Sequence, residues 1–258
     1  MSEIINSLIA YAGQPSLLPT LLAISLAGLV RGFAGFGGAM LFIPVGAALF
    51  DPVTIVVAFF LIDTFVALPL LLGALKLWNW RSVFPVLLGS WCGVSLGAYL
   101  LANMAEAPLR WSISAIIVLL AALLLSGWRY RDEPKLPVSL TVGAVSGVLG
   151  GVSQVSAPPV VAYWLSGPFE PSVIRANLIC FFCFASLGSG LAFFANGVFT
   201  PDAGALSLWL APFYGAAIFA GARLFSGAGD KLLRRVALAL IVFAALMSVP
   251  ALDPLLGR

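Results

Sequence analysis

Residues 32–38 read Gly-Phe-Ala-Gly-Phe-Gly-Gly and interrupt an apolar stretch that runs from residue 16 to residue 50. A helix of about 35 residues would be about 52 Å long, whereas the hydrocarbon core of a bilayer is roughly 30 Å thick. Glycine suits a helix interior poorly, because it loses the most backbone freedom on ordering. The stretch is therefore predicted to break, tilt strongly or fold back at these glycines. Close packing of helices through glycine is the alternative interpretation.

The composition excludes an ordinary soluble protein. Hydrophobic residues make up 62% of the 258 residues and charged residues only 9%, too few to cover a surface in water. The lipid bilayer is therefore an expected partner. Nucleic acid is not, because the basic residues lie in short loops. The chain has no His, and Cys92, Cys180 and Cys183 lack paired ligand spacing, so we expect no metal and no cofactor. The apolar stretch after Pro15 is too long for a signal-peptide core, so no cleaved targeting segment is expected.

The two halves of the chain match one another. At an offset of 115, four special residues of the first half coincide with four of the second: Gly28, Gly32, Gly35 and Pro44 with Gly143, Gly147, Gly150 and Pro159. Each half reads as one glycine-broken stretch followed by three stretches of spanning length. These are 16–50, 52–75, 82–103 and 108–128, then 137–168, 172–196, 203–226 and 231–250. We predict an all-α integral membrane protein with an N-terminal segment at 1–15, repeat 1 at 16–128, a basic connecting loop at 129–136, repeat 2 at 137–250 and a C-terminal tail at 251–258.

The charges of the loops predict how the broken stretches run. If all eight stretches cross the membrane, the loop Lys and Arg residues divide six against five between the two sides. If each broken stretch returns to its starting side, they divide nine against two, which is a positive-inside pattern. Each half then crosses an odd number of times, so repeat 2 is predicted to be inverted and both termini external. Inverted repeats with paired broken helices are typical of secondary transporters, whose substrate site lies near the midplane.

Residues at the two breaks are candidates for binding an anion. A broken helix frees backbone N–H groups, and a helix N-terminus carries partial positive charge. An Arg inside an apolar segment marks a functional site, although one near a helix end can simply snorkel. Asp63, midway along 52–75, is either a proton carrier or one partner of an ion pair. The predicted substrate-binding residues are Arg31, Gly35, Gly37, Gly38, Gly150, Gly151, Ser153, Gln154, Ser156, Arg175 and Asn177. No catalytic residue and no metal ligand is predicted.

Three local patterns carry a resemblance to a known family. They are the run 32–38 followed by Pro44, the run 147–151, and Ser156-Ala-Pro-Pro-Val-Val-Ala-Tyr163 followed by Arg175. Together with the eight stretches they make residues 16–250 resemble the sulfite exporter TauE/SafE family of bacterial membrane transporters. The resemblance implies movement of sulfite, sulfoacetate or other organosulfonates across the inner membrane. Ser156 and Ala157 stand where relatives often have glycine, so a hydroxyl donor replaces flexible backbone there.

The sequence therefore predicts a secondary transporter, an exporter, of a small oxyanion by alternating access around a midplane site between two broken helices. An anion channel is the alternative, because the same residues could line a continuous pore. An intramembrane enzyme is less favoured, since no His is present for Ser–His or zinc hydrolysis and no carboxylates are paired within a segment. The chain also lacks the glycine-rich loop that binds ATP phosphates.

Overall fold

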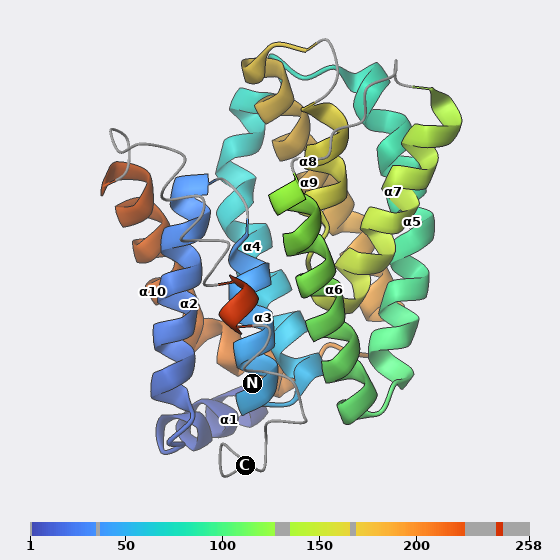
Figure 1. The fold of residues 1–258 in the computed structure, drawn as a ribbon. Coiled ribbons are helices and arrows are strands. Elements are labelled where there is room, and N and C mark those ends of the chain that lie inside the picture. Colours follow the sequence, from blue (N-terminus) through green and yellow to red (C-terminus); the bar gives the residue numbers. More distant parts are fainter. Residues whose placement is uncertain (1, 35–36, 127–134, 166–168, 225–240, 245–258) are drawn as a thin grey trace. The chain divides into compact units, whose positions relative to one another are not determined.

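The computed structural model describes residues 2–34, 37–126, 135–165, 169–224 and 241–244, and its regular structure there is helical (Figure 1). Both predicted breaks are present. The first apolar stretch divides into α2 (Leu17–Ala34) and α3 (Gly38–Leu49), and the fifth divides into α7 (Leu136–Ser153) and α8 (Ala157–Trp164). The unbroken stretches form α4 (Pro52–Ala74), α5 (Trp80–Asn103), α6 (Glu106–Ser126), α9 (Pro171–Ala195) and α10 (Pro201–Leu224). The predicted stretch 231–250 lies outside the described residues except for 241–244.

Helix length and composition confirm a multi-pass membrane protein. Within the described ranges, six helices are long and apolar enough to cross a bilayer: α4, α5, α6, α7, α9 and α10. Proline opens α4, α9 and α10, a position where its missing N–H group has no helical partner to lose. A further helix, α1 (Ser2–Ala12), lies in the N-terminal segment, where the sequence predicts none, and is bent by 95° from α2.

The chain forms two compact units that do not follow the order of the sequence. Unit 1 consists of residues 1–62, 104–121 and 198–258, and unit 2 consists of residues 63–103 and 122–197. Unit 1 therefore holds α1, α2 and α3 together with α10, and unit 2 holds α7, α8 and α9 together with α5. Each broken segment thus packs in a unit with the third long helix of the other predicted repeat.

In unit 1, glycines of α2 lie against α10. A Cβ atom at Gly28 would lie 2.7 Å from the Cβ atom of Ala217, and one at Gly32 would lie 3.0 Å from the backbone nitrogen of Ala222. Small residues at such positions let two helix backbones approach closely, which stabilises helix pairs in lipid. The short helix α1 is held to α10 by a 2.6 Å hydrogen bond from Ser7 Oγ to Asp202 Oδ1.

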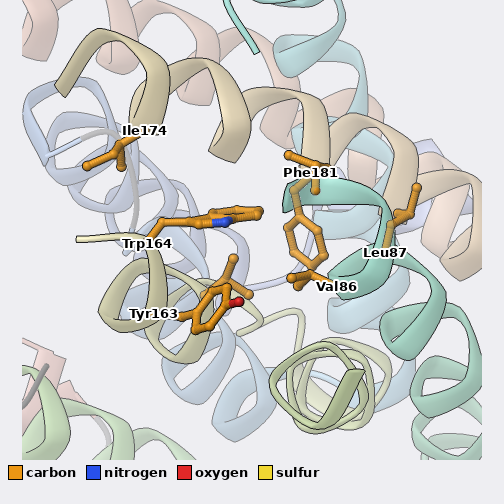
Figure 2. Packing of buried hydrophobic residues seen from close by; sticks show 8 residues of the cluster. Val86, Leu87, Tyr163, Trp164, Ile174 and Phe181 are labelled. Atoms are coloured by element: carbon orange, nitrogen blue, oxygen red, sulfur yellow. The ribbon is translucent and has the colours of Figure 1, made fainter. Parts of the chain in front are cut away.

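In unit 2, the same arrangement joins α7 to α5. A Cβ atom at Gly147 would lie 2.8 Å from the backbone nitrogen of Val94, and one at Gly151 would lie 2.7 Å from that of Ala98. The core of the unit is aromatic: the Trp164 ring at the end of α8 lies 5.8 Å from the Phe181 ring of α9, in an edge-on arrangement. Figure 2 shows these rings with Val86 and Leu87 of α5 around them.

Both broken segments fold back on themselves as helical hairpins. In unit 1 the ring of Phe50, which follows α3, lies 5.5 Å from the ring of Tyr11, which precedes α2. In unit 2 the hydroxyl groups of Tyr163, near the end of α8, and Ser139, near the start of α7, lie 2.6 Å apart. The nine-against-two charge count predicts such a fold-back, and the return of each segment to its starting side of the bilayer remains a prediction. The inversion of repeat 2 relative to the bilayer remains a prediction.

The helix boundaries correct the register of the predicted duplication. An offset of 119, rather than 115, carries the starts of α2, α3 and α4 onto those of α7, α8 and α9, and the end of α2 onto that of α7. This offset pairs Gly28 with Gly147 and Gly32 with Gly151, the glycines with equivalent packing against α10 and α5. The sequence match was misled because the glycines recur every four residues, so a shift of one helical turn still superposes glycine on glycine.

Candidate substrate-binding site

The first break places two glycines at the start of α3. Gly37 precedes the helix with φ at 94°, in the left-handed region that glycine enters without steric penalty. Gly38 is closely enclosed, because a Cβ atom there would lie 2.8 Å from the Tyr214 hydroxyl of α10 and 3.4 Å from the carbonyl oxygen of Ala27. Gly35, a third predicted residue, lies outside the described part of the chain. The glycines therefore shape a tight turn at which the N-terminus of α3 begins.

Arg31 lies beside this turn. It occupies the last turn of α2 and is half-buried, and a Cβ atom at Gly38 would lie 3.4 Å from its own Cβ. The first N–H groups of any helix have no partner within that helix, so α3 presents backbone donors next to the Arg31 side chain. A cation at the C-terminus of α2 also complements the dipole of that helix, which is the structural interpretation of the same position.

The second break is built differently, around Gln154. This residue ends α7 with φ at 57°, a left-handed conformation unusual for a residue with a side chain. Its backbone N–H and its side-chain Nε2 both donate to the carbonyl oxygen of Gly150, each at 2.9 Å. The amide side chain therefore closes the end of α7 in place of a terminal glycine, and leaves its own oxygen as an acceptor.

Serine residues hold the two halves of this hairpin together. Ser146 Oγ donates to the carbonyl oxygen of Ser156 at 2.6 Å, which ties the start of α8 to the middle of α7. Ser153 is fully buried and its hydroxyl donates to Leu149 O in its own helix. Ser156 precedes α8 without capping it through its side chain, so within the described part of the chain its half-buried hydroxyl remains a donor beside the break. Of these three hydroxyls, that of Ser156 is the one the structure leaves for a ligand.

The predicted glycines of the second half have separate roles. Gly151 lies against Gly97 and Ala98 of α5, where any side chain would meet backbone. Gly150 instead faces Ser156, whose Cβ would lie 3.2 Å from a Cβ placed on the glycine. Gly151 is thus a packing residue, as the alternative interpretation of the glycines proposed, whereas Gly150 supplies the carbonyl that Gln154 caps.

Arg175 and Asn177 do not join the second break. Arg175 is exposed and Asn177 is fully buried, as expected for positions about 200° apart around a helix. Asn177 Oδ1 accepts a 2.7 Å hydrogen bond from the backbone N–H of Asn79, just before α5. Ser82, three residues after Asn79, accepts a hydrogen bond from the Trp164 indole N–H. Trp164 is the last residue of α8, whereas Ser156 precedes its first residue. Asn177 therefore lies near the end of α8, about one length of this 8-residue helix, roughly 12 Å, from the break.

Asp63 lies in the middle of α4 and is half-buried. Two polar residues of the core were not predicted. Tyr214 is fully buried beside Gly38. Arg110, which the charge count above includes among the loop Lys and Arg residues, lies in α6 with only 9% of its surface exposed. A hydroxyl or guanidinium group inside an apolar stretch is the signal that points to both. Within the described residues, no three His, Cys, Asp or Glu side chains are grouped to hold a metal ion.

Comparison with known protein families gives a match over most of the chain. The family model described as Sulfite exporter TauE/SafE matches residues 20–248, which is most of the chain. No curated protein and no solved structure matches it.

Proposed function

Because the chain belongs to the sulfite exporter TauE/SafE family, we propose that it is a secondary transporter that exports a small oxyanion, such as sulfite or an organosulfonate, across a bacterial inner membrane. The family is one of membrane transporters, and the helices described above make a multi-pass membrane protein. Transport by alternating access, rather than catalysis, is the activity that we assign to it.

The observation that carries the proposal is the pairing of Arg31 with the start of α3. Gly37 and Gly38 turn the chain so tightly that the start of α3 lies close to the Cβ atom of Arg31, which is a half-buried residue. Backbone donors and a planar cation bind several oxygens of one anion at once. A hydrogen bond in which the donor or the acceptor is ionised is about twice as strong as one between neutral groups.

The second break contributes neutral donors. The Ser156 hydroxyl and the first N–H group of α8, that of Ala157, lie next to Gln154. Pro158 and Pro159 follow at once and have no N–H group. The start of α8 therefore offers fewer backbone donors than the start of α3, and the serine hydroxyl compensates for them. We assign to this break the recognition of oxygen atoms, and to Arg31 the recognition of charge.

The membrane potential supplies the driving force in this proposal. Moving one negative charge out of a negative-inside cell is favoured by about 2.3 kcal/mol per 100 mV. An exporter of an anion therefore needs neither ATP nor a coupled proton. Asp63 then serves as a structural partner rather than as a proton carrier.

Flux into liposomes tests this function. We expect saturable uptake of radiolabelled sulfite that unlabelled sulfite on the opposite side accelerates; flux without such counterflow would identify a channel instead. Arg31→Ala should lower sulfite flux about tenfold or more, the value of one or two charge-assisted hydrogen bonds, and Arg31→Lys should restore part of it. Arg223→Ala is the matched control, because Arg223 occupies the last turn of α10 but is exposed and lies over the Phe219 ring. Wild-type flux in Arg31→Ala would remove this arginine from the mechanism.

A further inference from the structure

Asn177 has an unsatisfied donor in the interior of unit 2. The hydrogen bond from the backbone N–H of Asn79 fixes the orientation of the carboxamide, since only its oxygen can accept. Its Nδ2 atom is buried and has no hydrogen-bond partner among the residues that the structure describes. Most buried polar groups in proteins are paired, and an unpaired donor costs about 1–3 kcal/mol. A fully buried amide in this condition points to a partner that binds there.

The amide lies beside the N-terminus of α5. Asn79, whose N–H it accepts, immediately precedes that helix, and Asn79 itself accepts from the backbone N–H groups of Ser82 and Val83. The N–H groups of Trp80 and Arg81 come before the first helical acceptor and have no partner within the helix. An end of a 24-residue helix carries partial positive charge and binds anions.

A hydroxyl group adds a further donor at this helix end. Ser82 Oγ accepts from the Trp164 indole N–H at 2.8 Å, which leaves the hydroxyl proton for another acceptor. Three kinds of donor therefore belong to residues at this helix end: an amide N–H, a hydroxyl and backbone N–H groups. An oxyanion accepts from all three, whereas a cation or an apolar molecule accepts from none.

The charged residues around this end of unit 2 favour the same ligand. Lys76 precedes α5, Arg81 is in its first turn and Lys135 precedes α7, and all three are exposed. Glu170, at the start of α9, is also exposed and is an opposing charge among the described residues of this side. The basic residues belong to the predicted cytoplasmic side, where an exporter takes up its substrate.

We propose that Asn177, Ser82 and the first turn of α5 form a capture site for a small sulfur oxyanion, separate from the two breaks. The proposal rests on the transport function proposed above and adds a second position for the same substrate. A site that an anion occupies on entry affects the substrate concentration needed for transport more than the maximal rate.

Steady-state sulfite flux in liposomes tests the site through Asn177→Asp. This substitution keeps the oxygen that accepts from Asn79 but replaces the unpaired donor by a second oxygen. We expect KM for sulfite to rise tenfold or more, because the variant loses about one hydrogen bond to a charged ligand and gains a carboxylate that repels the anion, with a smaller change in kcat. Asn196→Asp is the matched control at the other end of α9, because its Nδ2 is already bonded to Ala192 O. Its KM should equal that of the wild type.

The outcomes separate the two proposals. If wild-type protein carries no sulfite or sulfonate, the transport function itself is wrong. If the wild type transports and Asn177→Asp has an unchanged KM, the carboxamide only holds the start of α5 and the capture site is refuted. Should Asn177→Asp fail to fold, as judged by thermal unfolding in detergent, Ser82→Ala takes its place. A KM in Ser82→Ala equal to that of the wild type would then refute the site.

Discussion

The contact between Gly151 and α5 makes a prediction whose sign can be worked out from the structure. A Cβ atom at Gly151 would lie 2.7 Å from the backbone nitrogen of Ala98 and 2.8 Å from the Cα atom of Gly97, whereas ordinary contact begins at 3.4 Å. Both neighbours are backbone, so no side chain can turn aside. Gly151→Ala therefore forces α5 and α7 apart by about 0.7 Å, the difference between 3.4 and 2.7 Å.

Separating two packed helices removes dispersion contacts along their whole interface. Overpacking of a close contact typically costs about 1–3 kcal/mol. For a chain of this size, a loss of about 2 kcal/mol lowers the midpoint of thermal unfolding by roughly 4–8 °C. Gly215→Ala in α10 is the control, because no atom of the described residues lies within 4 Å of a Cβ atom there. Alanine is the better helix former by about 0.5–1 kcal/mol, so this variant should be slightly more stable than the wild type.

Thermal unfolding of the purified protein in detergent, followed by tryptophan fluorescence, measures both variants under the same conditions. We expect Gly151→Ala to unfold several degrees earlier and Gly215→Ala to unfold at or above the wild-type midpoint. Equal midpoints for all three proteins would show that α5 and α7 are not in backbone contact. The packing role assigned to Gly151 would then be wrong.

Three further predictions follow from the breaks, the topology and Asp63. Gln154→Gly should be more stable than Gln154→Ala by about 1 kcal/mol in thermal unfolding. Both variants lose the side-chain hydrogen bond to Gly150 O, but only alanine keeps the energetic penalty of the left-handed φ of 57°. Equal stabilities of the two variants would contradict that conformation. Positions 132 and 228, outside the described residues, should both be cytoplasmic, and both termini should be external. Single cysteines introduced at the two positions should therefore not react with an impermeant thiol reagent added from outside. Labelling that places the two positions on opposite sides would favour eight straight crossings instead. If Asp63 is a structural partner, Asp63→Asn should lower thermal stability and abolish flux in every transport mode, because breaking a buried pair leaves a charge uncompensated. If the variant loses only the dependence of flux on a pH gradient, and keeps counterflow and stability, Asp63 carries protons instead.

The sequence by itself determined the class of the protein and the positions of its helices. Hydropathy and spanning length are local properties of consecutive residues, so the apolar stretches predicted α4, α5, α6, α9 and α10 to within two residues at their starts. The breaks near Gly37 and Gln154 were also readable, because a stretch too long for the bilayer has to be interrupted and glycine marks the weakest helix.

Only the tertiary structure decided which residues meet. Asn79 and Asn177 are 98 positions apart, and no local pattern predicts their hydrogen bond. The hairpin of α7 and α8 depends likewise on the contact between Ser139 and Tyr163. Gly151 and Gly150 are neighbours of one residue type, yet one faces the backbone of α5 and the other Ser156. A periodic glycine pattern shows that a helix face packs closely, but the partner of that face, and the register of the repeats, follow from where the other helices lie.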